Sequence, residues 1–167
     1  MTHLNAVDTF RQLVNAHNVA PVQALFVPDN AGPPPYPNVG LTTGVGPQFT
    51  FQNGIGILFT ALFASFPNLV FSYVNTLRPE DGNTIAVEAL LTTGPHVAKW
   101  APQGAPVSPP LSLIEPHGSA GSTNLPVCAV FLFESNHSDL IKNLGLYFDR
   151  WKLAMDVWDR VHPSHLA

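Results

Sequence analysis

The chain has 167 residues, of which 46 % are hydrophobic and 11 % charged, and its formal net charge is −4. This length and hydrophobic content suffice for one compact domain with a single core. The 7 Lys and Arg residues are scattered and form no basic stripe, so neither a nucleic acid nor an anionic membrane is expected as a partner.

Cysteine usage and the first residues indicate the compartment. Cys128, the single cysteine, lies in an apolar run, so an intrachain disulfide is excluded and a small buried side chain is expected. No basic segment followed by an apolar stretch opens the chain, and no apolar run is long enough to span a bilayer. We therefore expect a cytoplasmic protein.

The N-terminal segment has the apolar spacing of two helices. Residues 5–17 carry apolar side chains at helical intervals, which predicts a helix with Asn5 as its N-cap. A second, short helix is predicted to open at Pro21 and to end near Phe26.

A longer helix and a hairpin follow. Apolar side chains face one side of a helix over residues 48–66, and the proline directly after it is expected to stop it. Residues 69–77 and Thr84–Thr92 are predicted as paired strands, joined by a turn at residues 80–83.

Two segments rich in Pro and Gly interrupt this pattern. Residues 30–47 and 101–124 are predicted to be loops, and Leu111, Leu113 and Ile114 within the second are candidates for a short strand or a flap. We expect the first loop to flank the domain beside a pocket mouth, with a Pro-rich peptide ligand as the alternative.

The C-terminal part contains the most informative stretch. Residues 126–134 are predicted to form a strand and residues 141–149 another, in which every second residue from Ile141 to Asp149 shares one face. After Asp149 the apolar spacing becomes that of a short helix. Asp149 therefore either caps this helix or lies in a cavity, where it would exchange protons.

The order of elements predicts an α+β fold. Helices come first, a meander of at least four strands follows, and a short helix ends the chain, which is typical of helices packed on one face of a curved antiparallel sheet. Such a sheet with helices across its open side makes a cone, whose interior is a natural apolar pocket.

Several strings, in this order, resemble the SnoaL-like branch of the nuclear-transport-factor-2-like superfamily. They are the helix–turn–strand segment 56–74, the hairpin 80–88, the strand end Gly94-Pro95-His96 and the last strand, 141–153. The resemblance covers most of the chain outside the two Pro-rich loops and implies one SnoaL-like domain over residues 1–167. It also implies a homodimer that buries part of the outer sheet face.

The same resemblance implies a role for Asp149, which matches an Asp that does acid/base work in the family's cyclases and epoxide hydrolases. Asn143 replaces the usual acid of this strand and Gly145 the usual Trp, which implies room for a differently shaped substrate. Limonene-type epoxide hydrolases pair their Asp with an Arg-x-Asp on a central strand, where this chain offers only Glu88. Ketosteroid isomerases need a Tyr on the first helix, where this chain has Phe10.

The remaining candidates each have two interpretations. Glu88 fits a solvent-facing position as well as a pocket carboxylate, and His96 is more typical of a structural residue than of a base. The predicted catalytic residues are therefore Asp149, Glu88 and His96. The predicted substrate-binding residues are Asn143, Tyr147, Tyr73, Gly145, Phe59 and Trp100.

The sequence predicts neither a metal nor a cofactor. The 7 His lack the spacing of a zinc motif, and no glycine-rich loop suits a phosphate. Our leading hypothesis is a cofactor-independent cyclase, isomerase or dehydratase that acts on a small, apolar, oxygenated substrate such as a polyketide or terpenoid. The alternatives are an epoxide hydrolase of the limonene type and a non-catalytic ligand-binding or protein-docking module.

Overall fold

The computed structural model describes residues 3–28, 40–42, 48–77, 82–95, 97 and 124–148. Residues 101–123 of the loop predicted at 101–124, the C-terminal helix predicted after Asp149 and part of the hairpin turn at 80–83 lie outside these residues. Asn124, predicted as the end of that loop, is instead the first residue of a strand. The elements are α1 (His3–Asn15), α2 (Val19–Ala24), β1 (Gly40–Thr42), β2 (Gln48–Thr50), α3 (Phe51–Ser65), β3 (Val70–Leu77), β4 (Thr84–Thr92), β5 (Asn124–Phe133) and β6 (Ile141–Tyr147).

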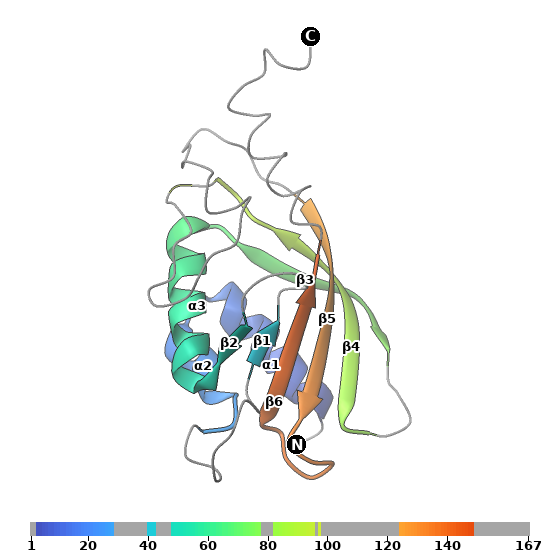
Figure 1. Cartoon of the computed structure of the whole chain (residues 1–167). Coiled ribbons are helices and arrows are strands. Elements are labelled where there is room, and N and C mark those ends of the chain that lie inside the picture. The colour runs from blue at the N-terminus through green and yellow to red at the C-terminus, as the bar shows by residue number, and fades with distance from the viewer. Residues whose placement is uncertain are drawn as a thin grey trace.

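The predicted α+β architecture is confirmed. The strands form one sheet in the order β2-β1-β6-β5-β4-β3, and the three helices cover one of its faces (Figure 1). The four long strands, β3 to β6, pair with one another in antiparallel fashion, whereas β1 pairs with β6 in parallel. None of the described helices is both long enough and apolar enough to cross a membrane.

Two predictions about the segment before α3 were wrong. Residues 40–42, predicted as part of a loop, form β1, which pairs with β2 on one side and with β6 on the other. Residues 48–50, predicted as helix, form β2, so α3 begins at Phe51. The partners of these short strands are distant in sequence, and such pairing overrides local propensity.

Helix α1 begins and ends differently from its prediction. It starts at His3, so Asn5 lies inside the helix and is not its N-cap. It ends at Asn15, and His17, two residues later, has left-handed geometry with φ 53°. The amide of His17 donates to Val14 O and that of Asn18 to Leu13 O, which is the Schellman pattern of a helix C-terminus.

Helix α2 was predicted to open at Pro21, but it starts at Val19. Pro21 still falls within the first turn of α2. Amide groups there have no partner inside the helix, so the missing N–H of proline costs nothing.

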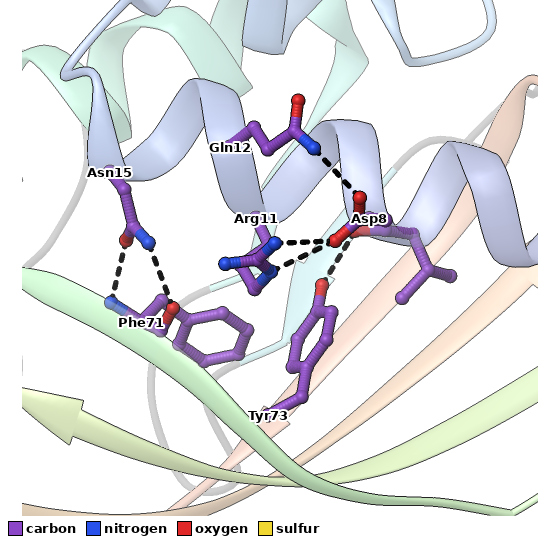
Figure 2. Close-up of polar contacts among 7 residues, drawn as sticks. Asp8, Arg11, Gln12, Asn15, Phe71 and Tyr73 are labelled. Carbon is purple, nitrogen blue, oxygen red and sulfur yellow. Dashed lines mark hydrogen bonds and ion pairs between the residues drawn. The ribbon is translucent and has the colours of Figure 1, made fainter.

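Helix α1 docks on β3 through hydrogen bonds from side chain to backbone (Figure 2). The Asn15 amide nitrogen donates to Phe71 O at 3.0 Å, and the Phe71 amide donates to Asn15 Oδ1 at 2.7 Å. His17 Nε2 bonds Leu69 O at 2.9 Å, and the His17 ring stacks on Phe63. Asn15 and His17 thus occupy backbone groups along the outer edge of β3.

The centre of the core is an aromatic cluster. The Phe10 ring makes edge-to-face contacts with rings from α3, β3 and β5, at centroid distances of 5.9 Å to Phe59, 6.2 Å to Phe71 and 5.2 Å to Phe131. All four side chains are buried. Phe10 therefore joins α1 to α3 and to the sheet.

The strands separate a buried inner face from an outer face. Along β5 the burial alternates, and Cys128 lies on the outer face, so its predicted burial was wrong. In β6 a register shift between Leu132 and Phe133 places Ile141 in the core beside Leu144, whereas Asn143 is exposed. The predicted alternation from Ile141 onward fails because this bulge inserts one extra residue.

A second bulge lies in β3, at the edge of the sheet. The register with β4 shifts between Tyr73 and Asn75, which leaves Val74 without an opposing residue. The Val74 side chain is 73 % exposed.

We predict that Phe10→Ala destabilises the fold by about 3–5 kcal/mol, because the truncation leaves a cavity where three aromatic rings meet. Urea unfolding followed by circular dichroism measures this. Phe148→Ala, which truncates a partly buried ring, serves as the control and should cost less. Equal losses for the two variants would contradict the central role of Phe10.

Candidate functional site

One end of the sheet, at the top of Figure 1, brings together termini of five elements. Strand β4 ends there opposite the first residues of β3 and β5, since Thr92 pairs with both Val70 and Asn124. Strand β6 ends at the same side, and the Val97 amide bonds the carbonyl of Ser65, the last residue of α3, at 2.9 Å. We call this the upper end of the domain.

The inner face of the sheet is incompletely covered at the upper end. Leu91 of β4, Leu146 of β6 and Phe148, directly after β6, are only partly buried. At the opposite end, Phe133 and Ile141 are fully buried, and Ile141 O and N bond the backbone of Val27 and Leu25. Some apolar surface at the upper end is therefore accessible to a ligand.

Two buried hydroxyl groups lie at the same end. Thr93 Oγ1 donates to Gly94 O at 3.1 Å, so part of its hydrogen-bonding capacity is used. Ser65 is 1 % exposed, and its Oγ has no hydrogen-bond partner within the described structure. Buried polar groups are normally paired, so Ser65 offers a free donor and acceptor. Sequence reasoning missed Ser65, because nothing in its neighbours signals an unpaired hydroxyl.

The Tyr73 hydroxyl is engaged in a structural bond (Figure 2). It donates to Val7 O of α1 at 2.6 Å, and the Arg11 guanidinium lies 5.8 Å from the centre of its ring. Burial raises the pKa of this phenol well above its ordinary value, and the positive charge of Arg11 opposes the shift only in part. Tyr73, a predicted substrate-binding residue, thus ties α1 to β3.

An acidic and a basic side chain pair on the surface beside Tyr73. Asp8 accepts hydrogen bonds from Arg11, at 2.6 and 3.0 Å, and from Gln12, at 2.7 Å. Both charged side chains are at least one third exposed, so the pair contributes little to stability.

Three predicted site residues lie on the outer face of the sheet. Glu88 of β4 and Tyr147 of β6 lie on either side of Cys128 of β5, which pairs with both of them. Glu88, Cys128 and Tyr147 are exposed. Asn143 is exposed on the same face of β6. All these residues lie on the face away from the helices, with Glu88, Cys128 and Tyr147 side by side across β4, β5 and β6. The sequence could not reveal this, because alternation separates two faces without identifying the buried one.

The space left by Gly145 is filled by the protein itself. A Cβ atom at this position would lie 2.7 Å from the Tyr147 ring and 3.0 Å from its hydroxyl. The missing side chain thus makes room for Tyr147, which lies along the outer face over Gly145.

The other predicted residues divide into two groups. Phe59 belongs to the central aromatic cluster, where it is 2 % exposed. Asp149, His96 and Trp100 lie outside the described residues. Asp149 directly follows Phe148 in the chain, and His96 stands between Pro95 and Val97, so both adjoin residues of the upper end.

The described part of the chain contains no group of three or more His, Cys, Asp or Glu side chains that could hold a metal ion.

Comparison with known proteins identifies the fold. No family model matches the sequence, and no curated protein matches it either. Solved structures do match. A proposed polyketide cyclase of Pseudomonas putida has a TM-score of 0.69 and 16 % identity, over 94 % of this chain and 98 % of that one. A proposed SnoaL-like polyketide cyclase of Jannaschia has a TM-score of 0.63 and 15 % identity, over 91 % and 90 % of the two chains.

A third match is an enzyme with a described role. SalBIII, an epoxide hydrolase/cyclase-like enzyme in pyran-ring formation in the polyether salinomycin, has a TM-score of 0.62 and 11 % identity, over 89 % of this chain and 92 % of that one. The predicted resemblance to SnoaL-like proteins is therefore confirmed at the level of fold. Identities this low leave the activity open, since this fold serves several functions.

We predict that Tyr73→Phe weakens the fold at neutral pH by about 1 kcal/mol, the usual contribution of one hydrogen bond. The pKa of Tyr73 is raised in the folded protein, so above a pH of about 10 the phenol ionises in the unfolded chain before it does in the folded one. The free energy of unfolding of the wild-type protein should therefore fall as the pH rises above about 10. Urea unfolding at pH 8 and at pH 10.5 measures both effects. Tyr73→Phe should lose less stability than wild type between these two pH values, and parallel losses would contradict the assignment.

Proposed function

We propose that this chain is a cofactor-independent acid/base enzyme that binds a small, mostly apolar, oxygenated substrate at its upper end and cyclises, isomerises or dehydrates it. The observation that supports this most is the combination found there, of partly buried apolar side chains around Leu91, Leu146 and Phe148 with the unpaired hydroxyl of Ser65. Apolar surface with a few polar groups is the usual composition of a small-molecule site.

Asp149 is the proposed proton-transfer group. It directly follows Phe148, which is partly buried at the upper end just after β6. An apolar setting favours the neutral form of a carboxylic acid, and a neutral acid can give its proton to a substrate oxygen. His96 is the proposed second proton carrier, and Trp100 a proposed wall of the site. Glu88, Asn143 and Tyr147 have no part in this proposal, because they are exposed on the opposite face.

Ser65 is the proposed polar contact for the substrate. Its Oγ can donate one hydrogen bond and accept two, which suits a carbonyl, hydroxyl or ether oxygen. A buried hydroxyl without a partner is unfavourable in the free protein. Binding an oxygenated ligand would remove that cost and so would favour such a ligand over a hydrocarbon.

The fold similarity to proposed polyketide cyclases and to SalBIII supports a polyketide or terpenoid as the substrate class. Opening of an epoxide is the second candidate, and SalBIII, an epoxide hydrolase/cyclase-like enzyme, favours it. The three-residue machinery of limonene-type epoxide hydrolases is the weaker fit, because Glu88, the sole carboxylate of β4, is exposed on the outer face.

We predict that Asp149→Asn lowers turnover by roughly a hundred- to ten-thousand-fold while ligand affinity is retained, because the amide cannot exchange a proton. A panel of polyketide and terpenoid ketones, hydroxyketones and epoxides, followed by mass spectrometry, identifies the substrate.

Ser65→Ala should raise KM more than it lowers kcat. Near-normal turnover by a folded Asp149→Asn variant would overturn the catalytic role. A panel in which ligands bind and none is converted, even by wild type, would favour the non-catalytic binding module.

We also propose that the outer sheet face pairs two copies of the chain as a homodimer. Tyr147 on β6 is 48 % exposed, Val70 on β3 is 41 % exposed, and Cys128 lies exposed between these strands on β5. Exposed apolar side chains spread over one face of a sheet are typical of a subunit interface.

We predict that Cys128→Arg converts this dimer to a monomer without unfolding the protein. The new guanidinium can pair with Glu88, its neighbour on β4, so the free subunit tolerates it, but a central interface would not. Light scattering at micromolar concentration measures the mass, and circular dichroism checks the fold. A wild-type monomer, or a Cys128→Arg dimer, would count against this interface.

A further inference from the structure

The His3 imidazole is surrounded by backbone carbonyl groups. Its Nδ1 lies 2.7 Å from Gly82 O, and its Nε2 lies 3.1 Å from Ser135 O and 3.0 Å from Ser138 O. The ring also stacks on Phe133, with 4.1 Å between the centroids and an angle of 4° between the planes. One side chain in the first turn of α1 thus contacts both the β3–β4 turn and the β5–β6 turn.

The hydrogen-bond acceptors around this ring determine which protonation state fits it. A carbonyl oxygen can only accept, so each ring nitrogen must carry a proton to bond its neighbours. A neutral imidazole has one N–H, so in either tautomer one nitrogen would turn a lone pair toward a carbonyl oxygen. Only the imidazolium satisfies both sides. We propose that His3 is a pH-sensitive clamp, which in its protonated form holds the start of α1 to the two turns.

The elements that pack around His3 carry titratable groups of both signs. The β5–β6 turn that packs on His3 carries Glu134, His137 and Asp139, Lys142 lies early in β6, and α1 carries Asp8 one turn further on. Glu134 accepts a hydrogen bond from the Ser138 hydroxyl at 2.9 Å. The positive end of the α1 dipole opposes the charge, but this effect is smaller than that of hydrogen bonds from a charged donor.

His17 provides a matched control within the same helix. Its ring stacks on Phe63, with 4.5 Å between centroids and an angle of 14°, and its Nε2 bonds Leu69 O at 2.9 Å. This is the one hydrogen bond of its side chain within the described structure, and a neutral imidazole can make it. Each histidine ring therefore stacks on a phenylalanine ring. The two differ in the number of ring protons that their hydrogen-bond partners require.

The experiment compares His3→Phe with His17→Phe, since phenylalanine keeps the stacking and removes the donors. Folding equilibrium constants are measured by urea unfolding at pH 5 and at pH 8, on either side of the ordinary titration of histidine at about 6.5. At pH 5 the ring is protonated in the folded and the unfolded chain, so the hydrogen bonds of both ring nitrogens contribute to the folding equilibrium constant. At pH 8 the unfolded chain holds a neutral ring, and the contribution of the clamp falls.

We expect the factor by which His3→Phe lowers the folding constant to be roughly tenfold larger at pH 5 than at pH 8, which corresponds to one hydrogen bond with a charged donor. For His17→Phe the factor should change by less than about twofold. Equal factors at both pH values for His3→Phe would overturn the clamp.

A measurement on the wild-type protein keeps the proposal testable if His3→Phe does not fold. Long-range proton–nitrogen correlation spectra distinguish an imidazolium, with two similar nitrogen shifts, from a neutral ring, with two widely separated shifts. At pH 7 the His3 ring should give the imidazolium pattern, because both of its nitrogens face carbonyl oxygens. The pattern of a single neutral tautomer at that pH would overturn the proposal.

Discussion

The packing of Phe10 between the sheet and α3 is the contact on which the rest of the domain depends. The inner face of strands β3 to β6 is largely apolar and must be covered. Helix α1 covers it by inserting one ring among rings from α3, β3 and β5. The Asn15 amide and the Tyr73 hydroxyl then fix how the helix lies across β3. Because the centre is filled, the partly buried apolar side chains of the described residues lie around it, and Leu91, Leu146 and Phe148 are those at the upper end.

The sequence predicted the long elements of this fold well, for a local reason. Strand β4 has the predicted bounds, since a hairpin turn before it and a Gly-Pro pair after it mark its limits. The two short strands before α3 were missed, because their partners lie elsewhere in the chain. The predicted face of the Ile141 side chain was wrong. A bulge depends on how two strands pair and has no signature within one of them.

The candidate site was harder to predict than the fold. Alternation correctly grouped Asn143 with Tyr147, but a largely apolar strand does not reveal which side the helices cover. Glu88 illustrates the difficulty, because its neighbours of equal parity, Ala86 and Leu90, are apolar although they too lie on the outer face. The Ser65 hydroxyl was overlooked since its significance comes from burial without a partner. Asp149 remains a prediction from the sequence, because it lies outside the described residues.

The bulge at Val74 has a consequence for how the protein behaves at high concentration. An edge strand normally presents a regular row of free amide and carbonyl groups, on which another chain can add a strand and begin a fibril. Along β3, the Asn15 and His17 side chains already occupy the backbone of Phe71 and Leu69, and the bulge breaks the regular spacing a few residues later. The edge of β3 is thereby a poor template for aggregation, even though the strand is rich in β-forming residues.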